Sequence, residues 1–219
     1  MDASEAGKRQ AAEAAASLVE DGMVLGLGTG STVAYFLPAV ATRGPRVRCV
    51  ATSLGTERAA RTLGLVVEPF ESLDRLDLAV DSADQVAPDR WLVKGGGGAH
   101  TREKIVAAAA SRFLVIVSSE KVVPALRPPV PLELMRFGLA ATLRRIWERG
   151  PVRLREAEPT PDVNLQADLA GEVGDPAELA AALDAIPGVV GHGLFDPSLV
   201  SDVLVGGEPG GVRRLPDPR

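Results

Sequence analysis

The chain of 219 residues has a single cysteine, so it cannot form an intramolecular disulfide. Cys49 falls in the apolar run Val47–Val50, which is typical of a strand, and we expect a buried thiol rather than a reactive one. No stretch reaches the roughly 18 uninterrupted apolar residues of a membrane span. The polar, mixed-charge start at Met1–Gln10 lacks the apolar segment of a secretion signal. These absences predict a cytoplasmic protein in a reducing compartment, with no membrane partner.

The chain also has no excess of positive charge, and few histidine or cysteine side chains that could bind a metal. The formal net charge of -5 argues against a general polyanion-binding surface, so we expect no nucleic acid partner. The two histidines, His100 and His192, and the cysteine show no metal-ligand spacing. We therefore expect no metal.

Helix-like and strand-like segments alternate up to about residue 125. The apolar runs are short and lack strict alternation with polar residues, which favours a mostly parallel sheet covered on both faces. The expected strands are Met23–Leu27, Val47–Ala51, Leu76–Val80, Trp91–Val93 and Phe113–Val117, and the expected helices are Lys8–Glu20, Ser31–Ala41, Thr56–Leu63 and Thr101–Ser111.

Proline usage changes in the second half of the chain. The cluster Pro124, Pro128, Pro129 and Pro131 predicts a boundary near residue 127, beyond which we expect an α+β insert or lid. The strand Val203–Val205 is expected to return to the first domain. The predicted domains are residues 1–126 plus 199–219, and residues 127–198. The insert's expected helices are Glu133–Arg149 and Pro176–Ile186, and its expected strands are Val152–Ala157, Val163–Asp168 and Val189–Phe195.

Predicted strands of the first domain end in polar or glycine-rich turns. The carboxyl ends of the strands line the ligand crevice in open α/β sheets, so we expect all five turns to meet at one site. These turns are Gly26–Thr32, Thr52–Ser53, Asp81–Asp84, Lys94–Gly98 and Ser118–Lys121.

The turn Gly28–Thr32 opens a helix and offers hydroxyls and backbone N–H groups, which suit a phosphate at a helix N-terminus. It is not a Walker A loop, and Val33 and Ala34 stand where a dinucleotide fingerprint has its third glycine. A purely structural turn is the alternative interpretation. Lys8 and Lys121 would add positive charge near an anion, and are otherwise solvated surface lysines.

The segment after Lys94 has four consecutive glycines, and their loss of backbone entropy on folding calls for a compensating role. Close approach to a ligand, with amides aimed at a developing oxyanion, is such a role. Asp81 and Asp84 are either turn and cap residues or paired carboxylates that face a pocket. Glu103 lies in the first turn of the next helix. Its negative charge either interacts favourably with the helix dipole, or its carboxylate acts as a general base. We interpret His100 as a flanking residue rather than the base.

Three motifs together resemble the ribose-5-phosphate isomerase type A family: Gly26–Thr32, Asp81–Asp84 and Lys94–Lys104. The last motif is highly specific, and the similarity extends over nearly the whole chain through Pro131–Glu133 and Ile186–Val190. The resemblance implies a Rossmann-like domain with a ferredoxin-like lid, assembled as a homodimer or a dimer of dimers. It also implies interconversion of ribose 5-phosphate and ribulose 5-phosphate in the pentose phosphate pathway, without a metal or cofactor.

By motif position, the resemblance implies Glu103 as the proton-transferring base, with Asp81, Asp84 and Lys94 as helpers. The implied substrate contacts are Thr29, Gly30, Ser31, Thr32, Ser82, Ala83, Gly95, Gly96, Gly97, Lys121 and Lys8. Two places depart from the family pattern. The family's Asp-Gly-Ala-Asp-Glu has Ser82 and Gln85 here, and its Asp-Asn-Gly-Asn lid turn appears only as Asp162-Val163-Asn164. If the family's glycine needs a positive φ, Ser82 costs energy and shifts Asp81.

The resulting hypothesis is an isomerase in which Glu103 takes the C2 proton and the proton returns at C1. Lys94 and the glycine-loop amides would stabilise the enediolate oxygen. Two rival classes remain: a sugar-phosphate sensor that binds without turnover, and a CoA transferase or glucosamine-phosphate deaminase on a similar fold. Assays of turnover on each substrate separate the three classes.

Overall fold

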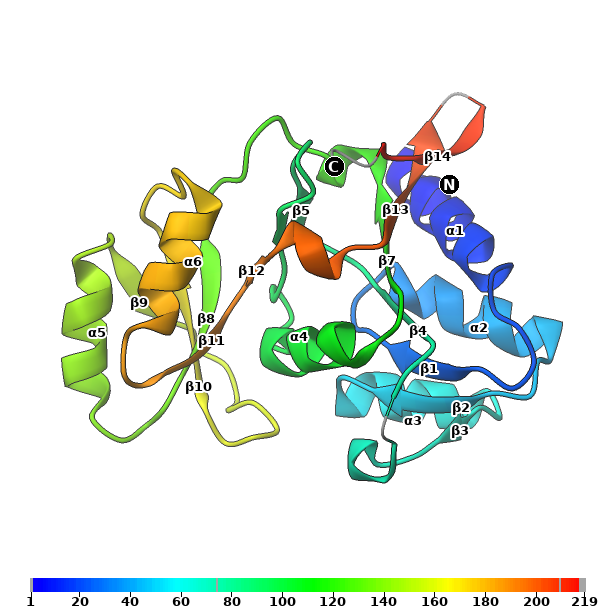
Figure 1. Ribbon diagram of the computed structural model, residues 1–219, viewed down its shortest axis with the longest axis horizontal. Coiled ribbons are helices and arrows are strands. Elements are labelled where there is room, and N and C mark those ends of the chain that lie inside the picture. The colour runs from blue at the N-terminus through cyan, green and yellow to red at the C-terminus, as the bar shows by residue number, and fades with distance from the viewer. Residues whose placement is uncertain (1, 74, 209, 217–219) are drawn as a thin grey trace. The chain divides into compact units, whose positions relative to one another are not determined.

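The structure is a computed structural model that describes residues 2–73, 75–208 and 210–216. These residues group into two units, each with its own hydrophobic core. Unit 1 comprises the described residues of Met1–Ala83, Arg102–Val122 and Ser198–Arg219, and unit 2 comprises Asp84–Thr101 and Val123–Pro197. Figure 1 labels the elements of both units. None of the helices in the described ranges is long and apolar enough to cross a membrane.

The apolar runs of unit 1 form a seven-stranded sheet in the order β14-β13-β7-β4-β1-β2-β3. All neighbouring pairs are parallel except β13 and β14. Every residue of β4 and β7 is buried, as expected of strands in a sheet with both faces covered. The mostly parallel sheet is thereby confirmed. The strands are β1 (Val24–Leu27), β2 (Arg48–Ala51), β3 (Val66–Val67), β4 (Leu78–Asp81), β7 (Phe113–Ser118), β13 (Asp202–Glu208) and β14 (Gly211–Arg214).

The helices of unit 1 alternate with these strands along the chain. They are α1 (Ala3–Ala16), α2 (Val33–Arg43), α3 (Leu54–Thr62) and α4 (His100–Ala109), whose first two residues belong to unit 2. Helix α1 packs against β13, so an early helix and a late strand of the sequence lie side by side (Figure 1). Small residues permit this contact, because a Cβ atom at Gly206 would overlap the carbonyl of Gly7. The expected return of the late strand is confirmed, since β13 pairs with β7 in parallel.

Unit 2 contains a four-stranded antiparallel sheet in the order β11-β8-β10-β9. Its elements follow each other as β8 (Val130–Leu134), α5 (Leu139–Trp147), β9 (Val152–Leu154), β10 (Leu165–Leu169), α6 (Pro176–Asp184) and β11 (Val189–His192). This βαββαβ order is the ferredoxin-like arrangement. Leu132 and Leu134 from β8 share one core with Ile146 of α5 and Leu183 of α6. A second, three-stranded antiparallel sheet joins β12 (Leu194–Phe195), β6 (Leu92–Val93) and β5 (Gln85–Val86).

Three sequence expectations about unit 2 were wrong. Trp91–Val93 does not join the parallel sheet, because β6 pairs with β5 and β12 instead. The expected helix Glu133–Arg149 begins only at Leu139; its first residues belong to β8, which lies between β10 and β11 with all five residues buried. The expected strand Val189–Phe195 is divided into β11 and β12, which pair in different sheets.

Asp84–Thr101 packs with unit 2, whereas the sequence-based boundaries assign this segment to the first domain. The boundaries at residues 126/127 and 198/199 remain a prediction about independently folding domains. Cys49 is fully buried, and burial raises the pKa of its thiol to about 12, so the expected buried thiol is confirmed.

The altered lid turn holds a strained residue. Val163 is exposed and has a φ of 66°, a left-handed conformation that is a genuine outlier for a β-branched side chain. Around it, the Thr160 hydroxyl and the Asn164 side-chain amide donate to the buried carboxylate of Glu133 at 2.8 and 2.9 Å. This anchoring keeps the turn in place although Val163 disfavours its backbone conformation.

We expect Val163→Gly to raise the free energy of unfolding by roughly 0.5–1 kcal/mol. Relief of a left-handed residue gains about 1–2 kcal/mol, and glycine's larger unfolded-state entropy offsets about 0.4–1 kcal/mol of that gain. Urea denaturation would show a higher midpoint with an unchanged slope. Val66→Gly is the control, since Val66 is an exposed strand residue of β3 and its replacement should lower the midpoint. A lower midpoint for Val163→Gly would show that the turn conformation carries no strain.

Candidate active site

The turns that follow β1 and β4 meet in unit 1. These strands are neighbours at the point where the strand order reverses, which is where doubly wound sheets bind ligands. Oδ1 of the buried Asp81 accepts hydrogen bonds from the N–H groups of Thr29 at 3.0 Å and Ser82 at 2.7 Å. The Ser82 hydroxyl donates to the Thr29 carbonyl at 3.0 Å. Asp81 and Ser82 therefore hold the glycine-rich turn from the neighbouring strand.

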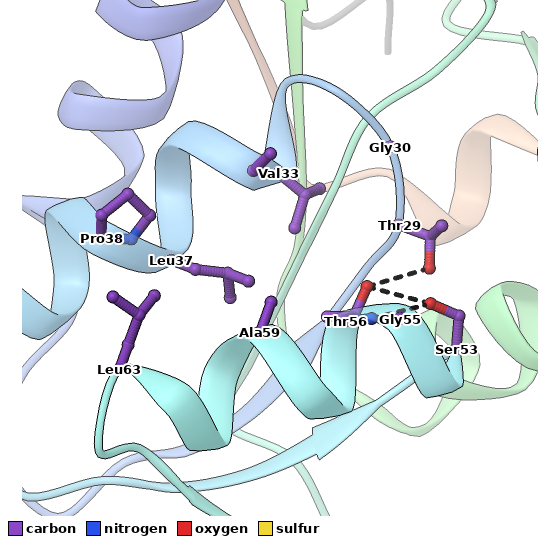
Figure 2. A pocket seen from close by; sticks show the side chains of 11 residues that line it. Thr29, Gly30, Val33, Leu37, Pro38, Ser53, Gly55, Thr56, Ala59 and Leu63 are labelled. Carbon is purple, nitrogen blue, oxygen red and sulfur yellow. Dashed lines mark hydrogen bonds between the residues drawn. The ribbon is translucent and has the colours of Figure 1, made fainter.

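A third turn contributes hydroxyl groups to the same place. The Thr29 hydroxyl lies 2.8 Å from that of Thr52 and 3.3 Å from that of Thr56. Thr56 also donates to the Gly28 carbonyl at 2.8 Å, and its N–H donates to the Ser53 side chain that caps α3. Figure 2 shows Thr29, Ser53 and Thr56 at the polar end of a cavity of about 370 Å³ between α2 and α3. Sequence reasoning did not single out Thr56, although Ser53, which caps the same helix, is of a residue type preferred at helix starts.

The glycines of this turn are required by close approach. A Cβ atom at Gly28 would overlap the Asp81 carboxylate, and Gly30 has a φ of 117°. Helix α2 then begins at Val33, after an exposed Ser31 and a buried Thr32. The first N–H groups of a helix have no partner within the helix and are suited to an anion. The structure thus places Thr29–Thr32 at a helix N-terminus, as the sequence predicted.

The four-glycine turn is part of unit 2. The Gly98 N–H donates to the Gly95 carbonyl at 3.0 Å, which closes the turn. The Asp84 carboxylate accepts the Gly96 N–H at 2.8 Å. Gly95 and Gly98 have positive φ values, and a Cβ atom would meet the His100 ring at the first and the Gln166 amide at the second. Only glycine fits both positions, and His100 packs directly on this turn.

Lys94 and Glu103 flank the turn in sequence and are both buried. Lys94 is 2% exposed, its N–H donates to the Gly193 carbonyl at 2.8 Å, and its Nζ lies 5.4 Å from the centre of the Phe195 ring in unit 2. Glu103, in the first turn of α4 and in unit 1, is 5% exposed. Glutamate and lysine are rarely buried without a specific partner or function. A favourable helix dipole alone would leave Glu103 at the surface, so its burial supports a chemical role.

The two candidate phosphate-binding lysines lie in unit 1. Lys8 donates to Glu5 at 2.5 Å, and Glu5 in turn accepts from the Tyr35 hydroxyl. The hydrogen bond to Glu5 raises the pKa of Lys8, which therefore stays protonated at neutral pH. Lys121 ends the short 3-10 helix Ser119–Lys121 after β7 and is half-buried. Ala83 is buried at the end of its unit 1 segment.

Arg155 is the residue that sequence reasoning missed most completely. Its guanidinium contacts the carbonyls of Gly95 and Gly96 from a distant segment of unit 2. An arginine at the end of a predicted strand carries no local signal of this contact, which only long-range pairing of β9 with β10 creates.

The concern about Ser82 was wrong. Among the described residues other than glycine, only Arg90 and Val163 have a positive φ, so Ser82 does not carry the strain that the family's glycine suggested. Its hydroxyl instead bonds to the Thr29 carbonyl, and the same oxygen would lie 2.9 Å from a Cβ atom at Gly30. Serine therefore acts as a tether for the turn in this chain.

We expect Ser82→Ala to raise KM about 2- to 10-fold with a smaller effect on kcat. A hydrogen bond of this kind contributes roughly 0.5–1.5 kcal/mol, and its loss frees the turn that precedes α2. Steady-state kinetics with a sugar phosphate substrate measures the change. Ser17→Ala is the matched control, since the Ser17 hydroxyl also donates to a carbonyl, that of Ala14, at the end of α1. An unchanged KM in Ser82→Ala would show that the tether is dispensable.

Comparison with known proteins gives consistent matches along the chain. The family profile for ribose 5-phosphate isomerase A (phosphoriboisomerase A) matches residues 48–210. The ribose-5-phosphate isomerase A of Caulobacter vibrioides (strain NA1000 / CB15N) is 46% identical over 222 residues, which cover 95% of this chain and 97% of the relative.

Solved structures give the same result. The ribose 5-phosphate isomerase A from Methanocaldococcus jannaschii is similar with a TM-score of 0.89 and 34% identity, covering 95% of this chain and 97% of that one. A D-ribose-5-phosphate isomerase in complex with phospho-erythronic acid has a TM-score of 0.92 and 33% identity, with coverage of 98% and 99%. The similarity therefore includes segments of both units.

Proposed function

The chain belongs to the ribose-5-phosphate isomerase A family and interconverts ribose 5-phosphate and ribulose 5-phosphate, and we propose that Glu103 is the base of this reaction. An aldose and its ketose differ in the carbonyl position, so a proton must move between C2 and C1 through an enediolate. The observation that carries the assignment is the burial of Glu103, 5% exposed, in the first turn of the helix that follows the four-glycine turn. A buried carboxylate so placed is suited to proton transfer away from bulk water.

We assign stabilisation of the enediolate oxygen to Lys94 and to the amide of Gly97. A buried ammonium and a rigidly held N–H are the groups that oppose developing negative charge most effectively. Asp84 supports this role through its hydrogen bond to the Gly96 N–H. Asp81 supports the reaction, because it bonds the turn that we assign to phosphate binding.

Phosphate recognition is assigned to the turn Thr29–Thr32, with Lys8 and Lys121 adding positive charge. The positive end of the α2 dipole and the hydroxyls of Ser31 and Thr32 suit a dianion. A similar isomerase binds phospho-erythronic acid. This ligand is also a useful probe here, because it combines a phosphate with a carboxylate whose charge resembles that of the enediolate.

We further propose a homodimer or a dimer of dimers that acts in the cytoplasm, in the non-oxidative pentose phosphate pathway. Large apolar side chains on unit 2 support self-association, since Phe137 is 89% exposed and Trp147 is 60% exposed. Sedimentation velocity measures the assembly state directly.

The test of the proposed function is an NMR assay of ribose 5-phosphate with purified protein, run with and without chelator. Formation of ribulose 5-phosphate supports the isomerase. Binding of the substrate without turnover would instead support the sensor, and turnover of glucosamine 6-phosphate or an acyl-CoA would support the third class. Competition by phospho-erythronic acid then shows that substrate and probe share one site.

A further inference from the structure

A bidentate ion pair in unit 2 supports the four-glycine turn. The Arg155 guanidinium, with its side chain 17% exposed, donates from Nε and Nη2 to the two carboxylate oxygens of Asp168 at 2.8 and 2.6 Å. Its remaining nitrogen, Nη1, donates to the Gly95 carbonyl at 2.9 Å and the Gly96 carbonyl at 3.1 Å. One planar group therefore links β10 to two successive peptide units of the turn. Arginine alone has donors on all three nitrogens in a rigid plane.

The peptide between Gly95 and Gly96 is held at both ends. Its carbonyl accepts from Arg155, and its N–H, on the opposite side of the planar peptide, donates to Asp84 at 2.8 Å. Opposite charges thus act on opposite ends of one peptide dipole, which fixes its rotation.

The next peptide unit is held by Arg155 at its carbonyl end. Because the Gly96 carbonyl points to Arg155, the Gly97 N–H of the same planar unit points away from Arg155. Gly96 and Gly97 are exposed, unlike the buried glycines on either side of them. Glycine has little intrinsic preference for one orientation, so an external group must select it.

We propose that Arg155 is a positioning residue for the isomerase reaction, which sets the direction of the Gly97 N–H toward the enediolate oxygen, while Asp168 holds the guanidinium. This inference rests on the oxyanion role proposed above for the turn. Arg155 does not touch the substrate in this scheme; it acts through the backbone that it orients. Its loss should therefore affect the transition state more than substrate binding.

The test compares Arg155→Gln, Arg155→Lys and Asp168→Asn with wild type. We expect kcat to fall about 10- to 100-fold in Arg155→Gln, because one misdirected oxyanion donor costs up to about 10²- to 10³-fold, with KM changed less than about 3-fold. Arg155→Lys should lose kcat to an intermediate extent, since an ammonium cannot contact both carbonyls and both carboxylate oxygens. Asp168→Asn should show a smaller loss in the same direction. Arg153→Gln is the matched control, because Arg153 is an exposed arginine of β9, the strand that ends directly before Arg155.

Two further readouts separate positioning from general stability. Affinity for phospho-erythronic acid should fall in Arg155→Gln, whereas affinity for inorganic phosphate should not change. Amide hydrogen exchange at Gly96, whose N–H donates to Asp84, should become faster, because its peptide loses the Arg155 contact at the Gly95 carbonyl. This measurement does not depend on any assigned base. An unchanged kcat in folded Arg155→Gln, or a loss confined to KM and to phosphate affinity, would overturn the inference. Should Arg155→Gln fail to fold, Arg155→Lys and Asp168→Asn decide by the same criteria. Failure of the proposed function gives a different result. If Glu103 is not the base, Glu103→Gln keeps its turnover, and the faster amide exchange in Arg155→Gln is still observed.

Discussion

Replacement of Glu103 by glutamine should abolish turnover of ribose 5-phosphate while leaving its binding nearly intact. The amide keeps the size of the carboxylate in a position that is 5% exposed, but it cannot accept the C2 proton. A positioned base contributes about 10²- to 10⁴-fold, and loss of the only one costs at least as much. The loss should therefore appear in kcat rather than in Kd.

Heavy water gives a second measurement of the same prediction. In wild type, deuterium should enter the substrate-derived carbon during turnover, because a base that carries a proton from C2 to C1 can exchange it with solvent. Glu103→Gln should show neither turnover nor exchange. Glu178→Gln is the control, since Glu178 is an exposed glutamate in the first turn of α6. Near-normal exchange in Glu103→Gln would mean that another residue is the base, with His100 and Asp81 the next to replace.

Removal of the phosphate from the substrate should have an effect of similar size. We expect kcat/KM for free ribose to be at least about 10³-fold lower than for ribose 5-phosphate. Hydrogen bonds to a charged group contribute roughly 1.5–3 kcal/mol each, and each 1.4 kcal/mol corresponds to a tenfold change. Two or three such bonds from the turn before α2, with Lys8 or Lys121, account for this loss.

Variants of the turn test where that energy originates. Ser31→Ala and Thr32→Ala should raise KM for ribose 5-phosphate and leave the already poor turnover of ribose unchanged, because only the phosphorylated substrate uses these hydroxyls. Ser31 is exposed, so its replacement leaves the packing of α2 undisturbed, whereas Thr32 is buried and needs a parallel measurement of unfolding. Equal kcat/KM values for ribose and ribose 5-phosphate would contradict phosphate anchoring altogether.

Much of the site could be predicted because its residues lie in contiguous motifs. The turn Gly28–Thr32 and the pair Asp81–Ser82 occur at the ends of predicted strands, and their contact follows from neighbouring parallel strands. The buried setting of Glu103 within the Lys94–Lys104 motif could not be predicted from its position alone. A first-turn glutamate has the same local signal whether it is exposed, as Glu178 is, or buried.

The sequence by itself determined the class of the fold and the identity of the motifs, because short apolar strands, helix-forming alanines and glycine turns act through local physics. Only the tertiary structure decided that Glu133 and Leu134 belong to a strand, since their burial between β10 and β11 outweighs their helical pattern. It alone also brought Arg155 and Asp168 to the four-glycine turn. Such contacts depend on which strands pair and in which register, and that choice is made by burial and hydrogen bonding summed over the whole unit rather than by neighbouring residues.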